Sequence, residues 1–238
     1  MKVAIIGYGK MGKIIEEILL ERNHTVVLKI NKNNLNDFTI DNLQKADVAI
    51  EFSNPDAAVN NYIKCFEAGI PVVSGTTAWL DKIQEVKAQI EEKKGTLFYA
   101  PNFSIGVNIY FKINEVLAKL MNNHPSYNAE MEEIHHKQKL DSPSGTAIKT
   151  AEIILEQLDS KTNWKEGKTA KNDELLIVVK RENGVPGTHT VSYTSEEDVL
   201  EFTHTAKSRR GFAMGSVLAA EWVLNKKGYF EMSDMLAF

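Results

Sequence analysis

The fold is decided by one stretch near the beginning of the chain, Val3-Ala4-Ile5-Ile6-Gly7-Tyr8-Gly9-Lys10-Met11-Gly12. Residues 3–7 are a short apolar run of strand length, and apolar residues then recur at helical spacing up to residue 21. Three glycines in the order G-x-G-x-x-G lie where the predicted strand gives way to the predicted helix. The stretch therefore predicts a strand, a tight glycine turn and a helix in direct succession.

A turn of this kind can bind a dinucleotide. Its glycines let the backbone approach a pyrophosphate, and the N-terminus of the following helix supplies free N–H groups and a partial positive charge. Glycines also interrupt many strand–helix turns that bind nothing, so a purely structural turn is the alternative. The position of the motif between a strand and a helix favours dinucleotide binding.

Strands and helices are predicted to alternate through the first hundred residues. Asn54 and Pro55 suit the N-cap and the first position of a helix. Alternation is typical of a parallel sheet covered on both faces, which indicates a Rossmann-type α/β domain. The further expected strands are residues 25–30, 46–52, 70–73 and 97–100, and the further expected helices lie within residues 55–69 and 79–95.

The pattern changes beyond Pro101. Helices are predicted at residues 106–121, 147–158 and 212–225, a polar surface loop at 159–173, and strands at 129–135, 175–179, 188–193 and 199–204. Successive strands joined by turns favour antiparallel pairing. We therefore expect a second, α+β domain with a mixed, mostly antiparallel sheet.

The composition excludes several classes of protein. The 238 residues carry 28 Lys and Arg against 32 Asp and Glu, and a net charge of −4 argues against a general nucleic-acid binder. Cys65 is the only cysteine, which excludes a disulfide framework and a thiolate zinc cluster. Neither a signal peptide nor an apolar run of about 20 residues is apparent. We expect a cytoplasmic protein that binds neither nucleic acid nor a membrane.

The end of the second predicted strand bears on the choice of cofactor. An acidic residue expected about 20 positions after the glycines, where it would bind the ribose 2′-hydroxyl, is absent. Asn31 tolerates either nucleotide, while Lys10, Lys29 and Lys32 could pair with a 2′-phosphate. We predict that NADPH is accepted at least as well as NADH; ordinary surface lysines are the alternative.

The densest chemical segment is Glu133-Ile134-His135-His136-Lys137-Gln138-Lys139-Leu140-Asp141-Ser142-Pro143-Ser144-Gly145-Thr146. Its last three residues begin a predicted helix, where backbone N–H groups and hydroxyls can bind a carboxylate. Histidine can donate a proton near neutral pH, and lysine adds positive charge. No metal is expected, because adjacent histidines usually cannot both reach one ion. A polar loop capped by Ser144 is the alternative.

This segment resembles the E-[IL]-H-H-x-x-K-x-D-[AS]-P-S-G-T-A signature of the dihydrodipicolinate reductase family. Further blocks resemble that family in the same order along essentially the whole chain: Gly75-Thr76-Thr77, Ala100-Pro101-Asn102-Phe103-Ser104-Ile105-Gly106-Val107-Asn108, Gly187-Thr188-His189-Thr190-Val191 and Phe202-Thr203-His204. The resemblance implies NAD(P)H-dependent reduction of 4-hydroxy-tetrahydrodipicolinate to tetrahydrodipicolinate in the diaminopimelate and lysine pathway.

The resemblance also implies an organisation of the chain. Residues 1–105 with 207–238 would form the dinucleotide-binding domain, because the last helix of the family returns to it. Residues 106–206 would bind the dicarboxylate substrate and assemble a homotetramer.

Carried over by motif, the family's site residues have the following implied roles. His135 would donate the proton with Lys139 as its catalytic partner. The substrate would contact His136, Lys139, Ser144, Gly145 and Thr146. The cofactor would contact Gly7, Tyr8, Gly9, Lys10, Met11, Gly12, Asn31, Lys32, Gly75, Thr76, Thr77, Ala100, Pro101, Asn102 and Phe103.

Two departures from the family bear on the cofactor. Lys10 stands where the family commonly has an arginine, and the acidic residue of the second strand is missing. Two other functions remain as alternatives: another two-domain NAD(P) dehydrogenase, and a nucleotide sensor without catalytic activity. The His135–Thr146 segment argues against the former, and the presence of both His135 and Lys139 against the latter.

Overall fold

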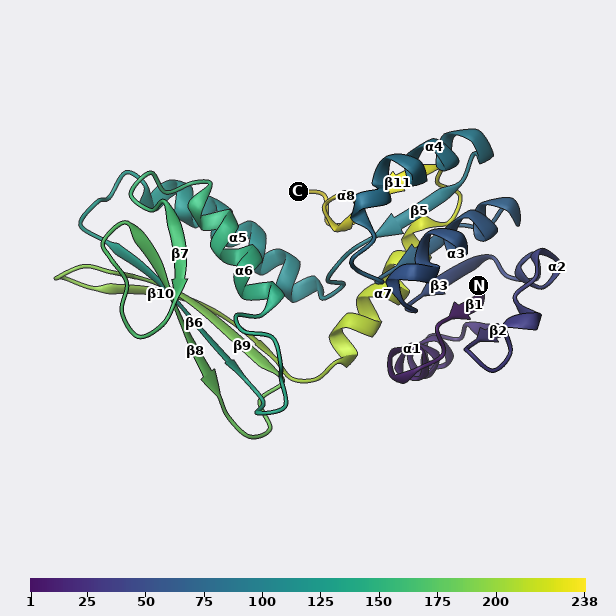
Figure 1. Cartoon of the computed structure of the whole chain (residues 1–238), viewed down its shortest axis with the longest axis horizontal. Helices are drawn as coiled ribbons and strands as arrows, with labels where there is room; N and C mark the ends of the chain where they lie inside the picture. Colours follow the sequence, from purple (N-terminus) through teal and green to yellow (C-terminus); the bar gives the residue numbers. More distant parts are fainter. The chain divides into compact units, whose positions relative to one another are not determined.

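The computed structural model describes all 238 residues, which form two compact units (Figure 1). Unit 1 consists of Met1–Ser104 and Arg210–Phe238, so it contains both ends of the chain. Unit 2 is continuous, from Ile105 to Arg209. Every helix is too short or too polar to span a bilayer.

Unit 1 is built on a six-stranded sheet of order β11-β5-β4-β3-β1-β2, and each neighbouring pair is parallel. This is the predicted Rossmann-type sheet, with one more strand than the sequence indicated. Its strands are β1 (Lys2–Ile6), β2 (Thr25–Ile30), β3 (Val48–Glu51), β4 (Val72–Ser74), β5 (Thr96–Tyr99) and β11 (Gly228–Phe230).

Helices cover both faces of this sheet (Figure 1). One face packs on α3 and α4 around Tyr62, Trp79 and Tyr99, whose rings meet edge to face. Against the other face, α7 contacts α1 as well as β3, β4 and β5. The helices are α1 (Lys10–Glu21), α2 (Ile40–Leu43), α3 (Pro55–Glu67), α4 (Ile83–Lys93), α7 (Arg210–Val223) and α8 (Met232–Leu236), with 3-10 turns η1 (Leu35–Asp37) and η2 (Leu80–Lys82).

Local sequence explains the helix that begins after β3. The side chain of Asn54 accepts a hydrogen bond from the Ala57 N–H, and Pro55 occupies the first turn, as predicted. The following buried side chains, including Tyr62 and Phe66, lie on the face toward the sheet. The cap thus fixes where the chain turns from β3 into α3.

Unit 2 contains a mixed five-stranded sheet of order β10-β9-β6-β8-β7. β9 pairs antiparallel with both β10 and β6, whereas β8 pairs parallel with both β6 and β7. The mixed sheet was predicted from the sequence. Its strands are β6 (Asn128–His135), β7 (Asn163–Glu166), β8 (Glu174–Arg181), β9 (Gly187–Thr194) and β10 (Val199–Ala206).

The helices α5 (Ile105–Met121) and α6 (Gly145–Leu155) pack together and against this sheet. Buried residues at alternate positions of the strands, such as Met131, Ile177 and Val191, share a core with them. One prediction is wrong here: residues 159–173 are not wholly a loop, because they include the edge strand β7. Its four residues have no buried side chain, so hydrophobic alternation gives no sign of a strand.

Candidate functional site

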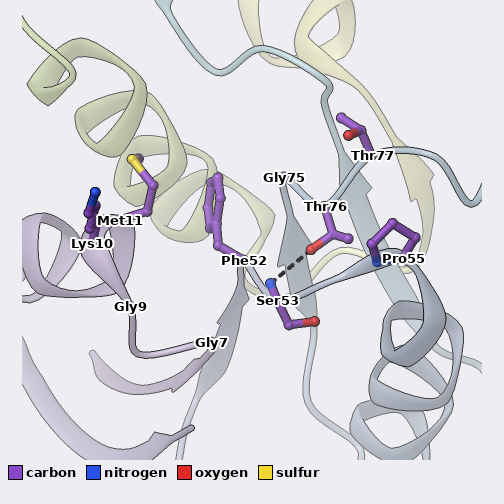
Figure 2. A pocket seen from close by; sticks show the side chains of 10 residues that line it. All are labelled: Gly7, Gly9, Lys10, Met11, Phe52, Ser53, Pro55, Gly75, Thr76 and Thr77. Carbon is purple, nitrogen blue, oxygen red and sulfur yellow. Dashed lines mark hydrogen bonds between the residues drawn. The ribbon is translucent and has the colours of Figure 1, made fainter. Parts of the chain in front are cut away.

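A pocket of about 460 Å³ lies in unit 1 where β1, β3 and β4 end (Figure 2). These strands are neighbours in the parallel sheet, so the loops after them meet at one edge. Ligands of open α/β sheets bind outside the carboxyl ends of the strands. The pocket is lined by Gly7, Gly9, Lys10, Met11, Phe52, Ser53, Pro55, Gly75, Thr76 and Thr77.

Two of these glycines are required by the close approach of the loops. Gly7 has a φ of +94°, and a Cβ there would lie 2.0 Å from the carbonyl oxygen of Phe52. A Cβ on Gly75 would lie 2.2 Å from the ring of the same residue. Any larger residue at either position would push the loops apart.

A buried carboxylate holds together the loops that follow β3 and β4 and line the pocket. Glu51, the last residue of β3, is fully buried and accepts hydrogen bonds from the hydroxyls of Ser74, at 2.6 Å, and Thr76, at 3.1 Å. The Ser53 hydroxyl and the Asn61 amide also donate to it. Thr76 in turn accepts the Ser53 N–H at 2.9 Å, as Figure 2 shows. One acidic side chain thus holds two segments that line the pocket.

Several residues predicted to contact the cofactor do not line this pocket. Three of them, Gly12, Ala100 and Phe103, are buried. A Cβ on Gly12 would lie 2.8 Å from the carbonyl oxygen of Gly7, so this glycine serves the packing of α1 beneath the loop. The predicted residues outside the lining are Tyr8, Gly12, Asn31, Lys32, Ala100, Pro101, Asn102 and Phe103.

The lysines beside the predicted ribose site differ in their contacts. Lys29 forms an ion pair with Glu16 at 2.5 Å and lies 5.0 Å from the centre of the Tyr8 ring. Glu16 also accepts a hydrogen bond from the Tyr8 hydroxyl. Lys10 and Lys32 are exposed. Lys29 therefore already has a carboxylate partner, which leaves the two exposed lysines as the better candidates for a phosphate.

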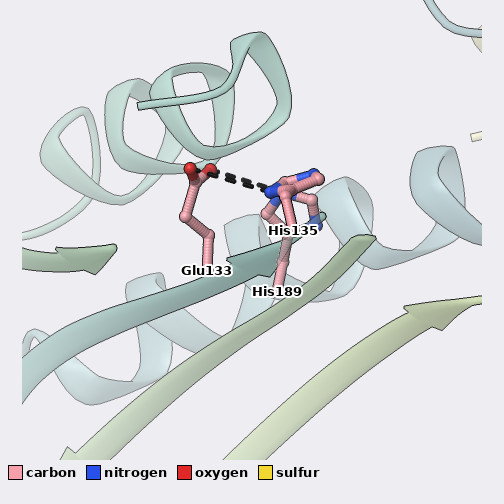
Figure 3. A group of neighbouring side chains, drawn as sticks. All are labelled: Glu133, His135 and His189. Carbon is pink, nitrogen blue, oxygen red and sulfur yellow. Dashed lines mark ion pairs between the residues drawn. The ribbon is translucent and has the colours of Figure 1, made fainter. Parts of the chain in front are cut away.

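A second cluster lies in unit 2, where Glu133, His135 and His189 meet on adjacent strands (Figure 3). Glu133 is fully buried, and the two imidazoles are nearly so. The Glu133 carboxylate is 3.7 Å from Nδ1 of His135 and 3.7 Å from Nε2 of His189. In addition it accepts the Ser144 N–H at 2.9 Å and a guanidinium N–H of Arg181 at 3.1 Å.

The electrostatics of this cluster differ among its members. Burial by itself raises the pKa of the Glu133 carboxyl, but the nearby imidazole of His135 and the donors of Ser144 outweigh burial and lower that pKa to about 2. Burial, reinforced by the nearby His135, lowers the pKa of the His189 imidazole to about 4. At neutral pH the cluster therefore contains an ionised carboxylate beside a neutral His189.

The cluster suits a hydrogen-bond network better than a metal ion. The candidate ligand atoms lie within 4.8 Å of one another. Both carboxylate oxygens of Glu133, however, already accept hydrogen bonds, one from Arg181 and one from Ser144. A cation would have to displace or face the guanidinium, which opposes its binding.

The remaining residues of the His–Lys segment surround this cluster. Lys139 Nζ pairs with the Asp141 carboxylate at 2.8 Å, and this contact lowers the pKa of Asp141. His136 is half-buried. Ser144 caps α6 by accepting the Ala147 N–H at 3.1 Å, and its hydroxyl lies 3.0 Å from His189 Nε2. Gly145 and Thr146 follow in the first turn of α6, where the helix favours an anion.

Sequence reasoning missed several members of the two sites. The sequence alone assigns no role to Glu133 or to His189, which lies in one of the blocks that resemble the family, and it does not single out Arg181. One signal in the sequence could have found Glu133 and Glu51. Each is a charged residue at a position of a predicted strand that is expected to face the core. Such a residue needs partners, but the sequence does not tell which ones.

Comparison with known proteins finds relatives along the whole chain. Residues 1–103 match the family model of the dihydrodipicolinate reductase N-terminus, and residues 106–236 match that of the C-terminus. The chain is 49% identical to the 4-hydroxy-tetrahydrodipicolinate reductase of Christiangramia forsetii, covering 100% of this chain and 98% of that protein. It is 35% identical to the enzyme of the same name from Archaeoglobus fulgidus, covering 99% and 100%.

Solved structures show the same fold. The dipicolinate-bound dihydrodipicolinate reductase of Paenisporosarcina sp. TG-14 superposes with a TM-score of 0.81 at 25% identity, covering 99% of both chains. An amine dehydrogenase of Mycobacterium smegmatis shares only the fold, with a TM-score of 0.60 at 10% identity over 97% of this chain and 94% of that one. Together with the family models, these matches place the chain in the dihydrodipicolinate reductase family of pyridine-nucleotide-dependent oxidoreductases.

Proposed function

We propose that this protein reduces 4-hydroxy-tetrahydrodipicolinate to tetrahydrodipicolinate in the diaminopimelate and lysine pathway. The overall reaction consumes one hydride and one proton and releases water. The observation that carries the proposal is the buried cluster around His135, beside the Ser144 helix start, in a chain of this family. The nicotinamide supplies the hydride. The protein's own groups have to bind the two carboxylates and deliver the proton.

Unit 2 offers groups for both tasks. Ser144, Gly145 and Thr146 begin a helix whose N–H groups and dipole favour a carboxylate. Lys139 would exchange its Asp141 partner for a substrate carboxylate, with His136 as a further contact. His135 would then donate a proton to the atom left electron-rich by hydride addition. The dipicolinate bound by the Paenisporosarcina relative is itself a cyclic dicarboxylate, which supports this substrate class.

Unit 1 offers a site for the nucleotide. The loop from Gly7 to Gly12 would hold the pyrophosphate at the N-terminus of α1. The segments 75–77 and 100–103 would line the nicotinamide side. Residues 29–34 contain no carboxylate, while Lys10 and Lys32 are exposed. Both NADH and NADPH are therefore proposed as cofactors.

The proposal extends to the assembly and location of the protein. By analogy with the family, unit 2 would join four copies into a homotetramer, and the enzyme would work in the cytoplasm. Sedimentation of the purified chain tests the first point.

One assay tests the reaction. The oxidation of NADPH and of NADH is followed by the absorbance of the reduced nicotinamide, with the fresh product of dihydrodipicolinate synthase as substrate. Turnover with both nucleotides is expected. Nucleotide binding without turnover would favour a sensor, and turnover only with other substrates would favour a different dehydrogenase.

A further inference from the structure

Glu133 lies at the centre of the polar cluster of unit 2 and connects parts of the chain that are far apart in sequence. Through one carboxylate oxygen it faces His135 Nδ1 at 3.7 Å and accepts from Arg181 at 3.1 Å. Through the other it accepts the backbone N–H of Ser144 at 2.9 Å and faces His189. The side chain is fully buried, so water does not compete for these contacts.

Arg181 extends the network to the loop that carries Lys139. While NH1 of Arg181 donates to Glu133, its NH2 donates to the carbonyl oxygen of Asp141 at 2.9 Å. The side chain of Asp141 in turn pairs with Lys139. Glu133 thus contacts the Ser144 turn directly, faces His135, and is connected to Lys139 through Arg181 and Asp141.

We propose that Glu133 is a positioning residue of the reductase, whose carboxylate holds His135 by its Nδ1 side and fixes the Ser144 turn in the same buried network. This inference rests on the proposed function, because it assumes that His135 donates the proton. Glu133 itself touches neither substrate nor cofactor in this scheme. It acts by setting which ring nitrogen of His135 is presented and by placing a negative charge beside the ring.

The geometry supports this role for His135. Its Nδ1 is buried and has no hydrogen-bond partner, and the Glu133 carboxylate faces it. A small rotation of either side chain would close the contact, as catalytic hydrogen bonds often tighten only when substrate binds. With Nδ1 directed at Glu133, Nε2 is the nitrogen left to exchange a proton.

The negative charge of Glu133 also faces both imidazoles, at 3.7 Å from each. The other titratable or charged groups around the two imidazoles are Arg181 on β8, His204 on β10 and Lys139 on the loop. All three carry or can gain a positive charge, which would repel a positive charge on His135, although that of Lys139 is paired with the Asp141 carboxylate. Glu133 is the carboxylate within the cluster that counteracts them.

The same strand supplies a matched control. Glu132 precedes Glu133 on β6, so its side chain points to the opposite face of the sheet, where it pairs with the partly exposed Lys180. Glu132→Gln and Glu133→Gln remove the same charge from adjacent positions. Only the second change alters the surroundings of His135.

The kinetic test compares these two variants by their pH–rate profiles. Glu133→Gln is expected to lower kcat on the order of 10- to 100-fold, part of what general acid catalysis supplies, with KM for NADPH unchanged. A proton donor has to be protonated, and Glu133→Gln removes the negative charge that faces the donor. The alkaline limb of the kcat profile should therefore move to lower pH, whereas Glu132→Gln should leave both the rate and the limb in place.

A second measurement does not depend on turnover. NMR of histidine-labelled protein, with the His135 signal assigned from His135→Gln, gives the ring tautomer and the midpoint of its titration. The midpoint should fall in Glu133→Gln but not in Glu132→Gln. The midpoint could fall in Glu133→Gln although the wild-type protein does not reduce the substrate. In that case the effect of Glu133 on His135 would stand while the proposed function would fail.

The Glu133→Asp variant distinguishes the positioning role from a general effect on folding. This variant keeps the charge and shortens the side chain by one methylene, so it should retain the wild-type limb and recover part of kcat, even if Glu133→Gln does not fold. Two results would overturn the inference. One is a folded Glu133→Gln variant with unchanged kcat and an unchanged alkaline limb of the kcat profile. The other is a Glu133→Asp variant whose alkaline limb lies at lower pH than that of the wild type.

Discussion

Gly187, the first residue of β9, lies against the imidazole of His135, so closely that a Cβ on Gly187 would be 2.9 Å from Nε2. That nitrogen is the one proposed to deliver the proton. The absence of a side chain at position 187 therefore allows the ring to occupy its present place. No left-handed backbone is involved here, so the constraint is purely one of space.

The first prediction follows from this contact. Gly187→Ala should displace the His135 ring by a few tenths of an ångström or more and lower kcat by about tenfold, because catalytic groups tolerate little misplacement. Steady-state kinetics measure the effect. Gly167→Ala is a suitable control, since a Cβ there meets nothing closer than 3.6 Å. Equal kcat values for the two variants would contradict the prediction.

The second prediction concerns the proposed catalytic pair. His135→Gln and Lys139→Ala should each lower kcat by about 10²- to 10⁴-fold, the range that general acid catalysis supplies. Binding of NADPH, followed by fluorescence, should persist in both because the pocket proposed for the nucleotide lies in unit 1. Near-wild-type turnover in either variant would show that its residue has been assigned the wrong role.

The third prediction tests Glu51, the buried carboxylate beside the pocket proposed for the nucleotide. Glu51→Gln leaves hydroxyl donors of Ser74 and Thr76 facing an amide, which should lower the free energy of unfolding by about 1–3 kcal/mol. Looser loops should also raise KM for the nucleotide more than they lower kcat. Urea denaturation and steady-state kinetics measure the two effects. The exposed Glu85→Gln serves as control, and a Glu51 variant indistinguishable from it would refute the prediction.

The fourth prediction concerns pH. Because burial lowers the pKa of His189 to about 4 from an ordinary 6.5, the unfolded chain binds more protons than the folded one between these values. Stability is therefore full above about pH 6.5 and falls as pH drops toward 4, by roughly 3 kcal/mol from this residue. His189→Gln should flatten that part of the stability curve in urea titrations at several pH values. A curve as steep as that of the wild type would exclude this cause.

The sequence was sufficient to predict the fold where local signals are strong. The glycine turn after residues 3–7 and the alternating apolar runs predicted the parallel sheet of unit 1, which the structure confirms. The strands β7 and β11 were missed because they are short and have no fully buried side chains. Their place in a sheet is decided by neighbouring strands rather than by their own residues.

In the candidate site, only residues that lie close together in the sequence could be predicted as a group. The segment from His135 to Thr146 was recognisable because its members are close along the chain. Arg181 and His189 reach Glu133 or Ser144 across 48 and 45 residues. They do so because β6 pairs with β8 and β9 in a register that puts His135 beside Arg181 and Glu133 beside His189. Strand register depends on the whole sheet and cannot be read from one segment.

Unit 1 is built from two separate segments of the chain, and this has a consequence for its synthesis. Its parallel sheet has β11 at one edge, and its α1 packs on α7. Both β11 and α7 are synthesised after the whole of unit 2. On the ribosome, the continuous residues 105–209 can therefore complete their fold while the earlier-made part of unit 1 still lacks α7, β11 and α8. The part of the protein that is translated first is thus the last to be finished.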